Sequence, residues 1–234
     1  PAYSEELRSS NIARTTSTYD VDRLGEFTLS YKKKIGRHHI DALAGYTLQK
    51  KTYDRLGVEA TGFADDRIHE VTAHGPKDSD VSLYETRKAA WSMMSYLARL
   101  NYSFDDRYTV TGTFRTDGSS RFGVNNRWGY FPSASLAWRV SGEDFFTKAK
   151  FLSFVDDLKI RTSYGVTGNF QIGNYDHLSL MALDNYILGT GNGQLVQGYK
   201  PNTIKNDDLS WEKNAMVNVG VDLQMFKGLL GITV

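Results

Sequence analysis

Four pairs of adjacent aspartates are the residues of this sequence with the clearest capacity for chemistry. Two neighbouring carboxylates can serve as general acid and general base, or they can bind a divalent metal ion. Each pair falls in a stretch that we predict to be a turn or loop, where aspartate commonly caps and turns the backbone. We therefore expect structural roles for these pairs, which are Asp65-Asp66, Asp105-Asp106, Asp156-Asp157 and Asp207-Asp208.

The other motifs that would carry chemistry are incomplete. His38-His39 lies beside a predicted hairpin turn and lacks a third ligand at a spacing typical of zinc sites. The run GTGNG from Gly189 to Gly193 lacks the GxGxxG spacing and the following helix of a nucleotide-binding loop. The sequence also contains no cysteine and no GxSxG motif. We predict that the protein is not an enzyme and needs no metal ion or cofactor.

A further group of polar and aromatic side chains suits binding better than catalysis. These side chains gather in the stretch Asp117–Arg139 and around residues 169–175, and they can hydrogen-bond to and stack on a sugar or a peptide. The candidate substrate-binding residues are Arg115, Arg121, Asn125, Asn126, Arg127, Trp128, Tyr130, Asn169, Gln171, Asn174 and Tyr175. The same residues can instead lock a loop and the ends of its strands, and this structural role is the interpretation that we favour.

The elements that position these candidates show strict alternation of apolar and polar residues. Tyr108–Thr116 and Pro132–Ser141 flank the polar stretch, and each alternates with the period of a strand that has one apolar and one polar face. Further strands with the same alternation are predicted at 25–32, 40–49, 158–164 and 215–225. The first two of these form a hairpin that reverses at Gly36. The sequence therefore predicts an all-β protein.

Five stretches depart from this simple alternation. Ala89–Phe104 has some helical spacing, but its residues from Tyr96 onwards alternate, so we predict a strand. Gly142–Phe154 is predicted as a short amphipathic helix or a wide turn. Arg14–Val21 is predicted to be irregular, and Lys51–Lys88 is predicted to be a long loop. Gly165–Tyr199 is also predicted as loop, with a strand around residues 175–183.

The predicted reversals differ in length in a regular way. Short reversals at Gly36, Asp105–Arg107 and Phe226–Gly228 alternate with long ones at Lys51–Lys88, Asp117–Tyr130 and Gly168–Ser210. Short turns at one end of the strands and long loops at the other are typical of an outer-membrane barrel. The connection 142–157 falls on the short-turn side although it is wider than the other three.

The two faces of the predicted strands indicate what each would contact. In a membrane barrel, apolar positions such as Leu136 and Val219 would contact lipid, whereas polar positions such as Thr111 and Arg161 would face a wet lumen or a plug. A soluble sheet with one solvated face gives the same alternation, and a small closed porin-like barrel is a third possibility. The formal net charge of +1 gives no argument for a nucleic-acid partner. No run approaches the roughly 18 apolar residues of a membrane helix.

Three long motifs in a fixed order resemble one family. DGSSRFGVNNRWGYFPSASLAWR (Asp117–Arg139), LKIRTSYGVTGNFQIGNY (Leu158–Tyr175) and NDDLSWEKNAMVNVGVD (Asn206–Asp222) are similar to the barrel of the SusC/RagA-type TonB-dependent transporters of Bacteroidetes. The resemblance covers nearly the whole chain, although the part before Lys88 matches only in general pattern.

The resemblance implies a fold, a location and partners. The family's fold is a transmembrane barrel of roughly 22 antiparallel strands with short periplasmic turns and long extracellular loops. Residues 1–234 would be a middle segment of that barrel, without the plug and the C-terminal strands. The implied function of the full protein is TonB-energised import of glycans or peptides across the cell outer membrane, with a SusD-like surface lipoprotein as partner. The segment alone is not expected to transport.

One alternative function from a different class follows from the residues alone. The Tyr- and Trp-rich loops also suit a soluble all-β glycan-binding or adhesion module. Cell fractionation separates the two hypotheses, because such a module stays soluble without detergent.

Overall fold

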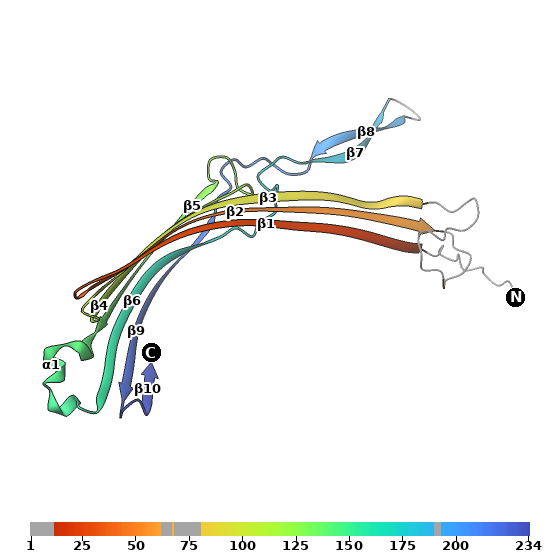
Figure 1. The fold of residues 1–234 in the computed structure, drawn as a ribbon. Helices are drawn as coiled ribbons and strands as arrows, with labels where there is room; N and C mark the ends of the chain where they lie inside the picture. The colour runs from red at the N-terminus through yellow and green to blue at the C-terminus, as the bar shows by residue number, and fades with distance from the viewer. Residues whose placement is uncertain (1–11, 62–66, 68–80, 190–192) are drawn as a thin grey trace. The chain divides into compact units, whose positions relative to one another are not determined.

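The computed structural model describes residues 12–61, 67, 81–189 and 193–234. Its described strands are β1 (Ile12–Ile35), β2 (His38–Thr61), β3 (Val81–Phe104), β4 (Tyr108–Ser119), β5 (Trp128–Arg139), β6 (Val155–Asn169), β7 (Met181–Leu188), β8 (Gln194–Pro201), β9 (Glu212–Met225) and β10 (Leu230–Thr233). One sheet has the order β1-β2-β3-β4-β5-β6-β9-β10, and β7 and β8 pair separately (Figure 1). The described pairings from β3 to β10 are antiparallel, which confirms the all-β prediction.

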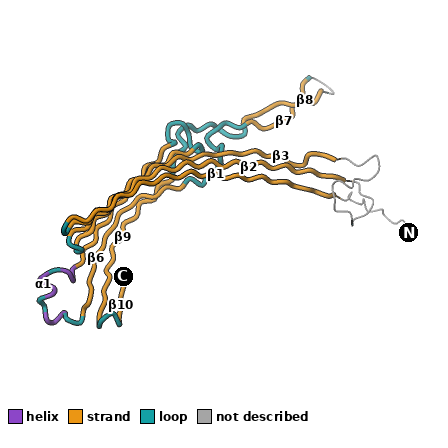
Figure 2. The backbone as a smooth tube through the Cα atoms, in the orientation of Figure 1, coloured by secondary structure: helices purple, strands orange, loops and turns teal. Residues whose placement is uncertain are grey.

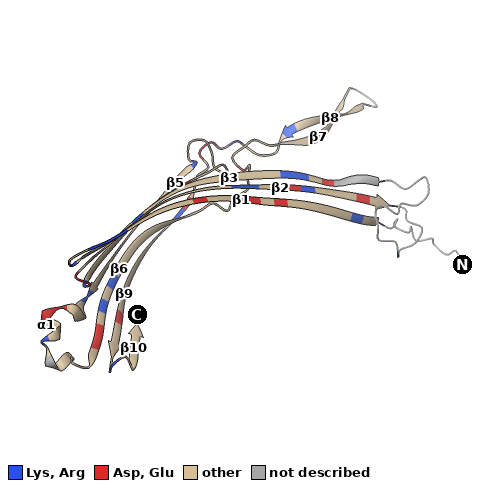
Figure 3. Ribbon diagram, in the orientation of Figure 1, with Lys and Arg blue, Asp and Glu red and all other residues tan. Residues whose placement is uncertain are grey.

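The chain divides into two compact units. The first comprises Pro1–Arg23 and Lys50–Trp91, and the second comprises Leu24–Gln49 and Ser92–Val234. In the first unit, ion pairs link the strands: Lys51 Nζ lies 3.0 Å from Asp20 Oδ2, and Arg55 Nε lies 3.1 Å from Glu85 Oε2. Charged residues of both signs follow these strands (Figure 3). The second unit holds all the candidate binding residues.

The charged strands of the first unit correct two predictions. Arg14–Val21 is not irregular, because β1 begins at Ile12. The prediction of a loop over Lys51–Lys88 is wrong at both ends, because β2 continues to Thr61 and β3 begins at Val81. Residues 62–66 and 68–80 lie outside the described part of the chain. The charged side chains pair across the strands, and such pairs hide the apolar alternation on which the prediction depended.

In the second unit, the strand registers sort side chains onto two faces. Thr109, Thr111 and the other odd-numbered residues of β4 lie opposite odd-numbered residues of β5, as in the pair Thr111 and Ser135. We call this side the polar face. Thr111 Oγ1 donates to Asn101 Oδ1 at 3.0 Å, and Arg161 Nε on β6 lies 3.2 Å from Asp222 Oδ2 on β9. Hydrogen bonds and ion pairs therefore join the polar side chains across neighbouring strands.

The opposite side of the same strands, the apolar face, is exposed. Val110 and Leu136 are paired on β4 and β5, and both side chains are exposed. Farther along the sheet, Val217 and Val219 of β9 are 69% and 72% exposed. A soluble sheet turns its polar face to water and buries its apolar face, whereas a transmembrane barrel turns its apolar face to lipid. The exposed apolar face fits the barrel.

The three predicted short turns are confirmed. Asp105 and Asp106 join β3 to β4 with φ angles of +56° and +52°, and Gly36 joins β1 to β2 with a φ of +59°. Two successive residues with positive φ match the right-handed twist of a hairpin, and aspartate adopts this conformation more readily than most residues. The pair Asp105-Asp106 therefore shapes a turn.

The connection between β5 and β6 contains the only helical turns among the described residues. These are the 3₁₀ turns Val140–Gly142 and Lys150–Leu152 and the helix α1 (Asp144–Thr147), which confirm the predicted short helix or wide turn (Figure 2). None of the described helices has the length and hydropathy needed to cross a membrane. The prediction of a strand over Ala89–Phe104 is also confirmed, since β3 includes it.

The region after β6 differs from its prediction. β6 continues to Asn169, and the strand expected around residues 175–183 is instead the pair β7 and β8. In this hairpin a Cβ atom added at Gly198 would lie 2.1 Å from Cε1 of Tyr186, so the glycine leaves room for the tyrosine ring. The prediction treated the glycines here as loop residues, whereas one of them serves cross-strand packing.

Candidate functional site

The loop between β4 and β5, residues 120–127, is held by backbone hydrogen bonds to a distant segment. Gly123 N donates to Leu209 O at 3.1 Å, and Asn125 N donates to Asp207 O at 3.2 Å. At the start of the loop, Ser120 N donates to Ser92 O at 3.0 Å. Paired backbone groups of this kind fix a loop much as a short strand would. The loop is therefore docked onto the segment 206–211, which leads into β9.

An aromatic core lies beneath this loop. Phe122 is fully buried, and its ring centroid lies 4.6 Å from that of Trp211. Phe131 of β5 meets Trp211 edge to face with centroids 5.3 Å apart. The Trp211 indole Nε1 also donates to Arg127 O at 3.0 Å, which satisfies its polar edge. This core ties the loop, β5 and the beginning of β9 together.

Arg121 is bound within the protein. Its Nε donates to Asn174 Oδ1 at 2.9 Å, its Nη1 donates to Phe170 O at 3.1 Å, and its guanidinium lies 5.3 Å from the centroid of the Phe170 ring. Burial lowers the pKa of Arg121 from its ordinary value, although the group stays charged at any physiological pH. The hydrogen bonds of Arg121 and Asn174 therefore hold the loop to the segment that follows β6.

The two asparagines of the loop are bound to a single aspartate. Asn125 Nδ2 donates to Asp208 Oδ1 at 2.8 Å, and Asn126 Nδ2 donates to the backbone O of Asp208 at 2.9 Å. Asp208 N in turn donates to Asn206 Oδ1 at 3.0 Å. The pair Asp207-Asp208 thus acts through hydrogen bonds that shape and hold the loop, as a structural role requires.

Two further candidates are also bound within the protein. Arg115 Nε donates to the buried carboxylate of Asp117 at 2.8 Å, and Arg115 Nη2 donates to Ser95 Oγ at 3.2 Å. Asn169 Nδ2 donates to Glu212 Oε2 at 2.9 Å, between β6 and β9. The bond to Asp117 lies within β4, whereas the bonds from Arg115 to Ser95 and from Asn169 to Glu212 join neighbouring strands.

Trp128 and Tyr130 lie apart from the other candidates. Both occupy even-numbered positions of β5, which place them on the apolar face with Leu136. The Trp128 ring stacks on the Tyr96 ring of β3, with ring centroids 6.0 Å apart. The ring centroids of Tyr130 and Phe114 lie 6.3 Å apart. Aromatic residues at strand ends on a lipid-facing surface are typical of an interfacial girdle.

Three candidates remain at the surface of the loop region. The side chains of Arg127 and Gln171 are exposed, and they make no hydrogen bond or ion pair within the residues that the structure describes. Tyr175 is 39% exposed on the segment after β6. The side chains of Arg127 and Gln171 can contact a ligand without breaking the docking of the loop.

The residues that hold this region together were not predicted from the sequence. Phe122, Gly123, Asp208 and Trp211 were not among the candidates, although all four lie in the motifs DGSSRFGVNNRWGYF and NDDLSW. A single aromatic residue beside a glycine within a polar loop indicates that the loop packs against another segment of the chain. The sequence does not show which distant segment receives it.

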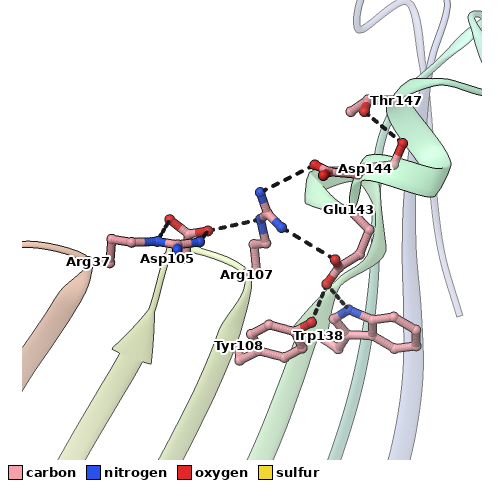
Figure 4. Close-up of polar contacts among 8 residues, drawn as sticks. All are labelled: Arg37, Asp105, Arg107, Tyr108, Trp138, Glu143, Asp144 and Thr147. Atoms are coloured by element: carbon pink, nitrogen blue, oxygen red, sulfur yellow. Dashed lines mark hydrogen bonds and ion pairs between the residues drawn. The ribbon is translucent and has the colours of Figure 1, made fainter.

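The opposite end of the strands carries a second polar network, at the short turns. Arg37 donates through Nε to Asp105 Oδ1 at 2.8 Å, and Arg107 Nε lies 3.2 Å from Asp105 Oδ2. Arg107 Nη1 also reaches Glu143 Oε2 at 3.4 Å (Figure 4). Glu143 Oε1 accepts hydrogen bonds from the Trp138 indole at 3.1 Å and from the Tyr108 hydroxyl. The network therefore fixes the connection 140–152 to two short turns.

Glu143 should make this connection sensitive to acid. The hydrogen bond from Tyr108 is the main cause that holds the pKa of the Glu143 carboxyl below its ordinary value of 4.5, followed by the bond from Trp138, with a contribution from Arg107. Because the pKa is lowered by folding, the stabilisation is complete above the ordinary pKa and is lost as pH falls through the lower folded value. We expect amide exchange in residues 140–152 to accelerate as pH falls below the ordinary glutamate pKa of 4.5 and through the lower folded value. The measurement is hydrogen exchange with rates corrected for intrinsic pH dependence.

Glu143→Gln is the control for this prediction. Glutamine keeps an oxygen that accepts from Tyr108 and Trp138, but it does not titrate. The variant should be less protected at neutral pH, and its corrected exchange should change less with acid than that of the wild type, because only the contribution of Glu143 is removed. Equal acid sensitivity in both proteins would mean that another group is responsible.

The histidine pair also has structural partners. His38 Nδ1 lies 2.7 Å from the Tyr102 hydroxyl, and His39 Nδ1 lies 3.1 Å from Asp106 Oδ1. Within the described residues, no group of three or more His, Asp and Glu side chains is placed to hold a metal ion.

Comparison with known proteins completes the description of the site. Residues 2–234 match the family model described as TonB dependent receptor-like, beta-barrel. The chain is 33% identical to TonB-dependent receptor P39 of Formosa agariphila over 94% of its own length and 20% of that protein. It is 34% identical to TonB-dependent receptor SusC of Bacteroides thetaiotaomicron over 86% of its length and 19% of that protein.

The chain also resembles solved structures. The chain resembles a structure of the RagAB peptide transporter with a TM-score of 0.80 and 31% identity, over 94% of its own length and 23% of that chain. A structure of the RagAB peptide importer in the "open-open" state matches with a TM-score of 0.79 and 32% identity over the same shares of each chain. The chain thus spans about a fifth of the length of the proteins that it matches.

Proposed function

Because this chain belongs to the TonB-dependent receptor-like β-barrel family, we propose that the full-length protein is an outer-membrane transporter that imports glycans or peptides. The observation that carries this proposal is the exposed apolar face of β4, β5 and β9, which needs a lipid environment. Relatives named TonB-dependent receptors support an energy input through TonB. The soluble all-β module considered from the sequence would leave the same apolar face in water.

The orientation of the segment follows from its connections. The short turns at Gly36, Asp105-Asp106 and Phe226–Gly228 face the periplasm in this proposal, because periplasmic turns of such barrels are short. The docked loop 120–127 and the β7–β8 hairpin then face the outside of the cell. A SusD-like surface lipoprotein would contact this extracellular end.

Substrate contact is assigned to Arg127, Gln171 and Tyr175. Their side chains are exposed beside the docked loop, where a rigid backbone supports adaptable polar groups. The side chains of Arg115, Arg121, Asn125, Asn126, Asn169 and Asn174 instead form the frame. A peptide offers carboxylate and carbonyl acceptors to Arg127, and a glycan offers hydroxyl groups to Gln171 and a ring to Tyr175.

Localisation and uptake test the proposal. Fractionation of cells should place the full-length protein in the outer membrane, and recovery in the soluble fraction without detergent would contradict a transporter. A strain that lacks the gene should lose uptake of one class of labelled substrate, either oligosaccharides or oligopeptides. Uptake should return when the wild-type gene is restored. Normal uptake of both classes in that strain would contradict import of glycans or peptides.

The double variant Arg127→Ala with Gln171→Ala tests the substrate contacts. Loss of two hydrogen-bonding side chains at about 1 kcal/mol each should weaken substrate binding by roughly tenfold or more. Affinity is measured by calorimetry on the purified full-length protein, with Val124→Ala, an exposed change in the same loop, as control. Equal affinity of the double variant and the control would contradict contact by these two residues.

A further inference from the structure

The connection between β5 and β6 carries an exposed aromatic patch. The patch consists of Phe145, Phe151 and Phe154 on this connection, with Phe226 and Leu229 on the neighbouring β9–β10 turn. Phe145 is 61% exposed, Phe151 is 77% exposed and Leu229 is 86% exposed. Large exposed apolar side chains gathered in one place indicate a surface that contacts something other than water.

The patch is an ordered surface. Phe146 and Val140 of the same connection are buried, whereas Phe145 and Phe151 are exposed, so the connection buries some apolar side chains and presents others to its surroundings. Phe146 N donates to Glu143 O at 3.0 Å, and Leu152 N donates to Ala149 O at 2.9 Å. These backbone bonds hold the helical turns in place.

The two parts of the patch are joined to each other. The rings of Phe154 and Phe226 stack with centroids 5.8 Å apart, and Phe226 N donates to Phe154 O at 2.9 Å. Gly228 N, in the same turn, donates to Asp156 Oδ2 at 3.0 Å. The β5–β6 connection and the β9–β10 turn therefore form one surface.

This surface continues the apolar face of the strands. Tyr108 and Trp138 lie opposite each other at the short-turn end of that face. Both donate to Glu143, the residue immediately before α1, and Figure 4 shows them reaching it from neighbouring strands. The beginning of α1 is thus tied to the side of the sheet that contacts lipid in the proposed function.

The charges around the patch fit a phospholipid headgroup region. Lys148 on the connection and Lys227 in the turn are exposed, and a headgroup phosphate can pair with each. The nearby acidic groups are already engaged, since Glu143 and Asp144 approach Arg107 and Asp156 accepts from Gly228. Phenylalanine interleaved with lysine is typical of segments that lie in a membrane interface.

We propose that the aromatic patch lies in the bilayer, at the boundary between headgroups and acyl chains of the leaflet at the short-turn end. This inference rests on the proposed function, because it needs a barrel in a membrane. The short-turn end is then held at a fixed depth by phenylalanine side chains in lipid and by Lys148 and Lys227 at the headgroups. A protein that covers the patch is the competing occupant, and the experiment separates the two.

The test uses labels that report their depth. Single cysteines replace Phe145, Phe151, Leu136 or Ile204 in the full-length protein, in a background without other cysteines; this segment contains none. Each variant carries an environment-sensitive fluorophore and is reconstituted in vesicles of phosphatidylethanolamine and phosphatidylglycerol. Lipids that carry a quencher near the headgroup or near the end of the acyl chain are then compared with a water-soluble quencher.

The expected result is a shallow position for the patch. Labels at Phe145→Cys and Phe151→Cys should be quenched most by the quencher near the headgroup, in keeping with a depth of about 5–10 Å. Leu136 lies on the apolar face two residues farther from the short-turn end than Trp138, so the label at Leu136→Cys should be quenched more by the deeper quencher. Ile204→Cys, 90% exposed at the opposite end of the strands, should respond only to the water-soluble quencher.

Other results overturn the inference in different ways. If the Leu136 label is reached only from water, the proposed function fails and the inference fails with it. If Leu136 is in lipid while Phe145 and Phe151 respond to the water-soluble quencher, the inference alone fails. If the two phenylalanine positions respond to neither lipid nor water quenchers, protein covers the patch and a membrane contact is excluded.

Discussion

Replacement of Gly123 by alanine is expected to detach the loop between β4 and β5 from the segment 206–211. An added Cβ atom would lie 2.0 Å from Asp207 O and 2.3 Å from Asp207 C, which are backbone atoms that cannot rotate away. The loop must then move, which breaks the hydrogen bonds from Gly123 N to Leu209 O and from Asn125 N to Asp207 O. Overpacking and the lost hydrogen bonds together should cost about 2–4 kcal/mol of local stability.

The measurement is hydrogen exchange of the full-length protein, read on peptides that cover residues 119–128 and 205–212. A loss of that size should accelerate exchange of these amides by roughly thirtyfold to a thousandfold, with strands far from the loop unchanged. Gly112→Ala is the matched control, because a Cβ atom at this β4 position meets nothing within 4 Å. If both variants exchange alike, the close approach at Gly123 is not what holds the loop.

Replacement of Phe122 by alanine should have an effect of similar or greater size through a different cause. Phe122 is fully buried against Trp211, and its removal leaves a cavity under the loop that neighbouring rings fill only in part. Truncation of a buried phenylalanine costs about 3–5 kcal/mol. We expect local exchange of the loop and of the start of β9 to accelerate by at least about a hundredfold.

Val124→Ala provides the control, because Val124 lies two residues away in the same loop and is exposed. Its effect should stay within about 0.5 kcal/mol. Trp211→Phe tests the polar part of the core: it keeps an aromatic ring but loses the hydrogen bond to Arg127 O, which is worth about 1 kcal/mol. If Phe122→Ala accelerates exchange no more than Val124→Ala does, the aromatic core is not what holds the loop.

These two variants also separate frame from contact. If the loop is a rigid frame, loss of docking should weaken substrate binding indirectly, with increased exchange. Variants at Arg127 and Gln171 should weaken binding while the exchange of the loop stays the same, because their side chains hold nothing together in the described structure. Measurement of both substrate affinity and hydrogen exchange for each variant therefore distinguishes a residue that touches substrate from one that positions the loop.

The extent of the strands was only partly predictable. The alternation of Tyr108–Thr116 and Pro132–Ser141 predicted most of β4 and β5, because each of these strands has one exposed apolar face and one polar face. The reversal predicted at Asp117–Tyr130 was too long, because β4 continues to Ser119 and β5 begins at Trp128. Alternation also predicted residues 25–32 of β1 and 40–49 of β2, but it missed the charged parts of these strands, where Asp20 and Lys51 form an ion pair instead of following an apolar pattern. A pattern based on hydropathy cannot recognise a strand whose side chains pair through charge.

The candidate site shows a different limit of prediction from the sequence. Residue types alone suggested that Arg121, Asn125 and Asn126 can bind a ligand, and each is suited to that chemistry. The structure places their hydrogen bonds on Asn174 and Asp208, at separations of 53, 83 and 82 residues in the sequence. Neither partner can be chosen from sequence spacing, since many polar residues in the other loops offer the same acceptors.

The sequence by itself determined the all-β class, the two faces of the strands and the short turns at Gly36 and Asp105-Asp106. These features depend on the period of side chains along a strand and on the backbone angles of single residues, which are local properties. Only the tertiary structure decided which polar side chains hold the loop 120–127 and which remain exposed for a ligand. A ligand contact at the exposed side chains remains a proposal. The division between side chains that hold the loop and side chains that are exposed depends on the docking of Phe122 against Trp211, whose segments are far apart in the chain and close only after folding.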